Sequence, residues 1–143
     1  EESSYLARQL ARRALTEGKN VIWDITMSSA PSTVKRIDEL RASGYQRVDG
    51  IFIDIPVETS VTRTGERHRR GHDRFLVGNG LGGRYVPAEV IRAQADAEFG
   101  SLNRRAFESV KDDFDHWTIY DNSVRGRSAA VIDRSSRDEP EQG

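Results

Sequence analysis

The sequence predicts a three-layer α/β domain with a mainly parallel sheet. Two short apolar runs, residues 21–25 and 51–55, have the composition of buried strands, and a helical segment that begins near Pro31 lies between them. A strand, a helix and a strand within about 35 residues are typical of a right-handed βαβ unit, whose two strands are parallel. Nearly continuous apolar strands suit a sheet that is covered on both faces. Further helical patterns follow along the chain, which favours the three-layer arrangement.

The boundaries of the elements come from hydrophobic spacing and from glycine and proline. Leu6 and Leu10 recur at helical spacing before Gly18, and Gly44 ends the helix that begins near Pro31. We expect helices over residues 3–17, 31–44, 57–70 and 102–114 and from residue 87, and strands over residues 21–25, 51–55, 117–120 and 129–132. One domain is expected over residues 1–133. The tail 134–143 is expected to be disordered, because it carries charges, serine and proline and no apolar side chain.

Composition excludes several classes of protein. The 143 residues include 22 basic and 23 acidic side chains, a formal net charge of −1, which argues against a general nucleic-acid-binding protein. No apolar run is long enough for a transmembrane helix, and no signal peptide is visible, so we expect no membrane partner. The lack of cysteine excludes disulfides, thiolate nucleophiles and cysteine-ligated metals, and it permits a cytoplasmic location.

Arginines gather on one face of the third expected helix. They lie at helical spacing, at Arg63, Arg67, Arg70 and Arg74. Converging guanidinium groups are suited to a polyphosphate, but a solvated basic face paired with acidic side chains fits the spacing equally well. The following segment, residues 78–83, matches G-x-G-x-x-G, yet it lacks the strand before it and the helix directly after it that a dinucleotide site needs. We interpret it as a lid that carries Arg84, with a plain surface loop as the alternative.

Polar side chains follow the first expected strand. Asp24, Thr26 and Ser28 lie where that strand ends, and ligands of parallel sheets bind beyond the carboxyl ends of the strands. These residues could therefore recognise a hydroxyl group. The alternatives are that Asp24 lies at a polar edge and that Ser28 or Ser29 caps the next helix. His68 and His72 are four residues apart but lack the glutamate of a zinc motif, so no metal site is predicted.

The order of these motifs resembles the zeta-toxin family, the P-loop kinases that phosphorylate UDP-N-acetylglucosamine. Residues 20–28 resemble the family segment that ends in an acidic-x-Thr signature. Arg67 with His68, then Arg84-x-x-Pro87, then residues 120–123 (Tyr-Asp-Asn-Ser) follow in the family's order. The resemblance covers roughly residues 1–123. It implies a parallel sheet of the P-loop nucleoside-kinase type.

The resemblance also implies roles for particular residues. Arg67 and Arg84 would be catalytic, gripping the ATP phosphates and stabilising the transferring γ-phosphoryl group, and Asn122 would contact ATP. The substrate-binding positions would be Asp24, Thr26, Ser28 and Arg36. At three of these positions the residue type differs, because the toxins have glutamate for Asp24, arginine for Ser28 and threonine for Arg36. The implied acceptor is therefore a nucleotide sugar, such as UDP-N-acetylglucosamine, or a similar small molecule.

One family motif is absent from the sequence. No G-x-x-x-x-G-K-[ST] occurs, and family members place this Walker A loop before the helix with which the sequence begins. We therefore expect the strand before that loop to be missing. Most of the ligands of the Mg²⁺ cofactor that the family implies would be missing with it, and we expect this chain alone to be inactive. The alternatives are an inactive truncated kinase remnant and a non-catalytic module that binds a polyanion or a protein. The family also implies a partner, a small antitoxin protein.

Overall fold

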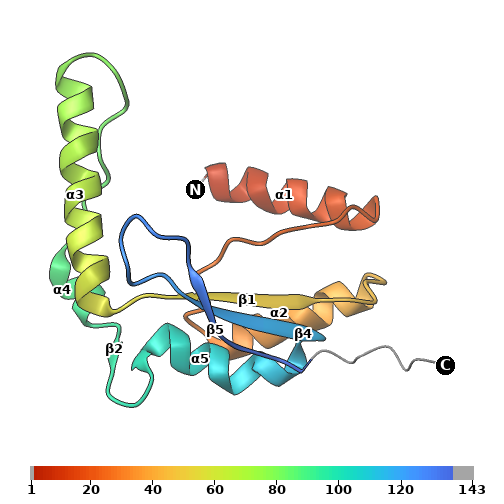
Figure 1. The fold of residues 1–143 in the computed structure, drawn as a ribbon. Coiled ribbons are helices and arrows are strands. Elements are labelled where there is room, and N and C mark those ends of the chain that lie inside the picture. Colours follow the sequence, from red (N-terminus) through yellow and green to blue (C-terminus); the bar gives the residue numbers. More distant parts are fainter. Residues whose placement is uncertain (1, 137–143) are drawn as a thin grey trace.

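A computed structural model of the protein describes residues 2–136. Figure 1 shows the order of its elements: α1 (Glu2–Thr16), α2 (Ala30–Ala42), β1 (Asp49–Asp54), α3 (Val57–Leu76), α4 (Ala88–Arg92), β2 (Ala95–Asp96), β3 (Gly100–Ser101), α5 (Leu102–Val110), a 3₁₀ turn (Lys111–Asp113), β4 (His116–Asp121) and β5 (Ala130–Arg134). The α/β class is as the sequence predicts. Among residues 2–136 no helix combines the length and the apolar composition that crossing a membrane requires.

The main sheet is mixed rather than mainly parallel. Its strand order is β1-β4-β5, with β1 parallel to β4 and β5 antiparallel to β4. The parallel pair is in register from Asp49 opposite His116 to Asp54 opposite Asp121. A parallel pair needs a crossover, and here the crossover includes α3, α4 and α5. The β2–β3 pair is a small separate hairpin.

The expected strand over residues 21–25 is wrong. This segment pairs with no strand of residues 2–136, and the side chain of Ile22 is 97% exposed. A strand exists only where a neighbour accepts and donates its backbone hydrogen bonds, and within residues 2–136 β1 pairs with β4 alone. The expected βαβ unit around α2 therefore does not form. The parallel pair joins β1 to a strand much later in the chain.

The core lies between the sheet and α5. Phe52 of β1, Phe107 of α5 and Ile119 of β4 form its centre, and the rings of Phe52 and Phe107 are 5.1 Å apart. Met27, Phe114 and Trp117 pack around them. Side chains alternate along a strand, so the neighbours of Phe52 point to the opposite face of the sheet.

The opposite face of the sheet is largely open, in contrast to the expected three layers. On β1, Ile51 is 61% exposed and Ile53 is 49% exposed. Figure 1 shows α1 on this side of the sheet and α2 with α5 on the other. Leu6 and Leu10 of α1 are themselves exposed, so α1 does not cover the sheet as a packed layer would.

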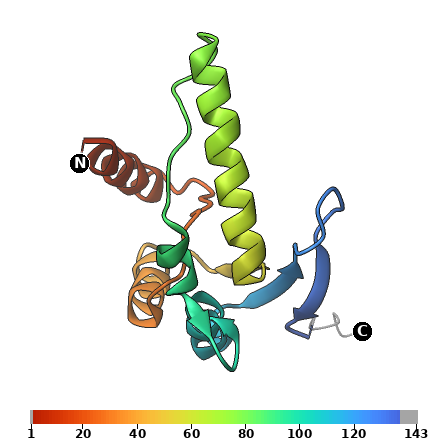
Figure 2. The ribbon, with the colours of Figure 1, turned by 90° about the vertical axis from the view of Figure 1, so that its left-hand side faces the viewer.

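Helix α3 forms a projecting arm with the segment that follows it. It runs to Leu76, beyond the expected end, and Figures 1 and 2 show residues 78–85 returning along it. We call residues 78–85 the strap. Gly71 and Gly83 lie so close that a Cβ on Gly71 would be 2.5 Å from the Gly83 Cα. Nδ1 of His68 lies 2.8 Å from the Gly83 oxygen, and it donates because a carbonyl only accepts. The segment predicted as a lid is thus packed on α3 here.

The end of β5 lies within the stretch that the sequence assigned to the tail. Arg134 ends β5, and Ser135 exchanges hydrogen bonds with Trp117, its backbone N–H donating to the Trp117 oxygen over 3.0 Å. Residues 137–143 of the expected tail lie outside the described residues. The helix expected to reach residue 114 ends at Val110 and continues as the 3₁₀ turn.

Candidate functional site

A cavity of about 380 Å³ opens beside the carboxyl half of β1, and we call it the β1 cavity. Its walls include residues 23–27, the last four residues of β1, and Ile55 directly after that strand. Polar side chains complete it, namely Ser60 of α3, Ser101 of β3, Asn103 of α5 and Gln94 of the turn between α4 and β2. Two residues that the sequence proposed for substrate binding, Asp24 and Thr26, lie in this wall.

A backbone kink shapes the wall around Thr26. Met27 has φ of +48°, a conformation that non-glycine residues seldom adopt, while its side chain packs against the core. Nδ2 of Asn103 donates to the Thr26 carbonyl over 2.5 Å. The hydroxyl of Thr26 lies 3.4 Å from that of Ser28. The burial of Met27 and the bond from α5 thus hold the segment that carries Asp24 and Thr26.

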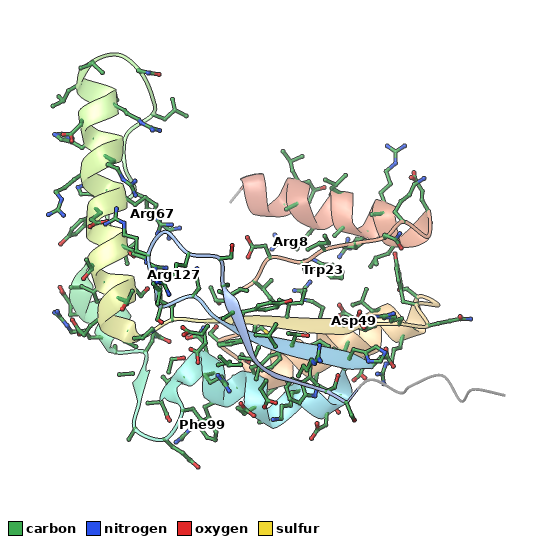
Figure 3. All side chains as sticks on the ribbon, viewed as in Figure 1. Arg8, Trp23, Asp49, Arg67, Phe99 and Arg127 are labelled. Carbon is green, nitrogen blue, oxygen red and sulfur yellow. The ribbon has the colours of Figure 1, made fainter. Side chains whose placement is uncertain are left out.

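A second cavity, of about 500 Å³, lies between α3 and the loop after β4, and we call it the arginine cavity. Arg63, Arg67 and Arg70 of α3 line it together with Arg125 of the loop, and Asn122 lies in the same wall. Figure 3 shows Arg67 on α3 and the loop of Arg127 beside it. Three of the four arginines on the predicted helical face therefore line one cavity. Arg74 is not in its wall.

The two cavities are neighbours. Ile55 and Ser60, at the junction of β1 and α3, line both of them. This junction is the carboxyl end of a parallel strand, where ligands of α/β sheets characteristically bind. A cationic cavity and a polar cavity thus meet at one end of the sheet.

Several bonds fix the loop that closes the arginine cavity. Asp121 accepts hydrogen bonds from the hydroxyl and the backbone N–H of Ser123, and these bonds lower the pKa of the Asp121 carboxyl below its usual range. Nη2 of Arg63 donates to the Ser123 carbonyl over 3.1 Å. Nη1 of Arg125 forms a 2.9 Å ion pair with Oε1 of Glu66.

Three residues proposed from the sequence lie outside both walls. Ser28 is exposed beside Thr26, and the neighbouring Ser29 caps α2 by accepting from the Ser32 N–H. The guanidinium of Arg36 stacks on the ring of Trp23, 4.6 Å from its centroid, and lines a different groove between α1 and α2. Arg84 is exposed at the end of the strap and lines neither cavity.

Sequence reasoning missed other residues of these walls. Asp54 ends β1 and lines the β1 cavity, and its position at a strand end was a usable signal. Arg104 holds that carboxylate with a 2.7 Å ion pair. Asn103, Glu66 and Arg125 had no sequence signal, because only tertiary packing brings them to the cavities.

The described side chains do not fit a magnesium site of their own. A hard divalent cation needs several oxygen ligands, and among the described residues no group of three or more acidic or histidine side chains is placed to hold a metal ion. The arginine cavity has the opposite character, since guanidinium groups bind phosphate or carboxylate oxygens.

Comparison with known families agrees with the motif order. The family model for zeta toxin matches residues 1–136, nearly the whole chain. Searches of curated proteins and of solved structures return no match. The match to the family model spans both cavities and the elements that carry them, and the chain therefore belongs to the zeta toxin family.

Proposed function

We propose that the protein functions in ATP-dependent phosphoryl transfer. The arginine cavity would bind the ATP phosphates, and the β1 cavity would bind the phosphate acceptor. The acceptor is a nucleotide sugar, such as UDP-N-acetylglucosamine, or a similar small molecule. The observation that carries the proposal is the shared wall of Ile55 and Ser60, which brings a cationic cavity next to a polar one. Phosphoryl transfer needs this adjacency, because the acceptor oxygen must attack the γ-phosphorus in line with the leaving oxygen of ADP, to which the bond breaks.

The arginines supply electrostatic stabilisation in this proposal. ATP contributes the transferred γ-phosphoryl group, and Arg67 is positioned by α3 to neutralise charge on the phosphates. Arg84 is a second catalytic candidate, and it has to approach from the strap to act. Asn122 contacts ATP from the loop after β4, while Asp24 and Thr26 orient the acceptor hydroxyl. No step is assigned to Mg²⁺, since the described residues do not fit it.

Equilibrium binding of ATP to the 143-residue chain tests the proposal. Arg67→Ala should weaken ATP binding about ten- to a hundredfold, the effect of removing a charge-assisted hydrogen-bonding partner. Arg69→Ala is the matched control, because Arg69 is exposed on the same helix and lines neither cavity. It should change the dissociation constant by less than about twofold.

The same titrations separate this proposal from a general polyanion-binding module. ATP and UDP-N-acetylglucosamine should bind more tightly than heparin at matched salt. Equal losses in Arg67→Ala and Arg69→Ala, with heparin preferred and a steep salt dependence, would overturn the kinase proposal in favour of the module. An antitoxin-like protein partner stays a prediction from the family.

A further inference from the structure

We propose that Arg125 is a further phosphate-binding residue and that Glu66 is its positioning residue. In the absence of ligand, the Glu66 carboxylate holds Arg125 in the arginine cavity, and a polyphosphate displaces the carboxylate while a single phosphate does not. This inference rests on the proposed function, because it assumes that the arginine cavity binds the phosphates of the nucleotide.

The ion pair is one-sided. Oε1 of Glu66 pairs with Nη1 of Arg125 over 2.9 Å, but Oε2 is buried and has no hydrogen-bond partner among residues 2–136. A carboxylate that only stabilised the fold would be expected to use both oxygens, since a buried acceptor without a partner costs free energy. The Arg125 side chain is 68% exposed, against 23% for Glu66. The glutamate is therefore the fixed member and the arginine the movable one.

The surroundings of the pair favour exchange for an anion. Among the residues that the structure describes, Glu66 is the single carboxylate in the cavity wall, beside the guanidinium groups of Arg63, Arg67, Arg70 and Arg125. A polyphosphate carries several negative charges and contacts several guanidinium groups at once, so it outcompetes one carboxylate for Arg125. Orthophosphate carries less charge and fewer oxygens. Competition from the Glu66 carboxylate thus makes the cavity selective for polyphosphates over orthophosphate.

The loop permits this exchange without unfolding. Its base is fixed at Ser123, which is bonded to Asp121 and to Arg63. Arg125 lies two residues further on, directly before Gly126, whose φ of +75° marks a tight turn. The Arg125 side chain is able to change partner while Ser123 stays in place.

The test measures binding of tripolyphosphate and of orthophosphate to the 143-residue chain. Glu66→Gln should tighten tripolyphosphate binding severalfold and orthophosphate binding by a larger factor, because the competing charge is gone. Arg125→Gln should weaken tripolyphosphate binding about tenfold and make that binding less dependent on salt, because one charged contact is lost and salt screens charged contacts. Glu58→Gln is the matched control, since it removes another α3 glutamate that is paired with an arginine, Arg92, outside the cavity. It should leave both affinities unchanged.

The outcomes separate the two proposals. If Arg67→Ala loses tripolyphosphate while the Glu66 and Arg125 variants bind like the wild type, the inference is overturned and the proposed function stands. If Glu66→Gln weakens binding of both ligands, the pair is structural and the inference is again overturned. Should Glu66→Gln not fold, the affinity and salt dependence of Arg125→Gln decide the question. Unchanged binding in Arg67→Ala as well would overturn both proposals.

Discussion

Arg104 and Glu108 form the most enclosed ion pair that bears on the site. Arg104 bonds both Asp54 in the β1 cavity wall and Glu108 one turn along α5, and Lys111 bonds the other oxygen of Glu108. Burial alone would raise the pKa of the Glu108 carboxyl, but the hydrogen bonds and positive charges of Lys111 and Arg104 outweigh it and lower that pKa below its ordinary value. A carboxyl whose folded pKa is lowered contributes stability above its unfolded pKa and loses it as the pH falls through the folded pKa.

Glu108→Gln should therefore lower the free energy of unfolding at pH 7 by about 1.5–3 kcal/mol, the contribution of a hydrogen bond to a charged group. The difference from the wild type should shrink below about pH 4.3, the unfolded value for glutamate. Urea denaturation at pH 7 and at pH 3 checks this. Glu89→Gln, an exposed position on α4, is the control and should show little change at either pH. A stability difference that does not depend on pH would contradict the argument.

At the scale of elements, the strap is attached to α3 by contacts that exclude a side chain. A Cβ on Gly83 would collide with the backbone of His68, and one on Gly71 would collide with the backbone of Gly83. We expect Gly83→Ala to cost about 1–3 kcal/mol and to release the strap, because backbone atoms must shift to make room. Limited proteolysis and hydrogen exchange of residues 78–85 measure the release.

Gly65→Ala is the matched control on the same helix. Nothing lies within 4 Å of a Cβ at Gly65, so alanine should stabilise α3 by about 0.5–1 kcal/mol through helix propensity. Protection of the strap should then be unchanged. If the strap of Gly83→Ala were as protected from proteolysis and hydrogen exchange as that of the wild type, its attachment to α3 would not depend on this close approach.

At the scale of the whole molecule, the open face of the sheet determines how the chain associates. Ile51 and Ile53 of β1 and Val131 of β5 are exposed, and so is Ile22 of the unpaired segment. Exposed apolar strands at a sheet edge promote association. We expect the 143-residue chain to aggregate with rising concentration, as measured by light scattering. At the high concentrations used in calorimetry, it should melt without a sharp transition. A sharp two-state melt of a monomer would contradict this prediction.

A double variant tests whether the open face causes the association. Ile51→Thr with Ile53→Thr keeps β-branched side chains that suit a strand and removes apolar surface. The double variant should raise the protein concentration at which light scattering begins. Its helix content, measured by circular dichroism, should change little. The same pair of measurements on Leu81→Thr, an exposed residue of the strap, should show a smaller effect.

Local signals in the sequence predicted the elements whose cause is local. Ser29 and Pro31 start α2, and the run around Ile51 forms β1 because apolar β-branched residues suit a pleated strand. The spacing of Arg63, Arg67 and Arg70 put them on one face of α3, since helical periodicity fixes direction. Membership of the zeta toxin family was likewise readable from the order of short motifs.

Tertiary structure decided the features that depend on a distant partner. The run at residues 21–25 has strand composition, but it pairs with no strand among the described residues, so it forms no regular element and its last three residues line a cavity. Arg125 reaches Glu66 across 59 positions of sequence, and no periodicity could signal that meeting. Residue type and spacing determine what a segment prefers and which way its side chains face. Pairing and packing, which are contacts between segments, determine whether that preference is realised and which side chains share a site.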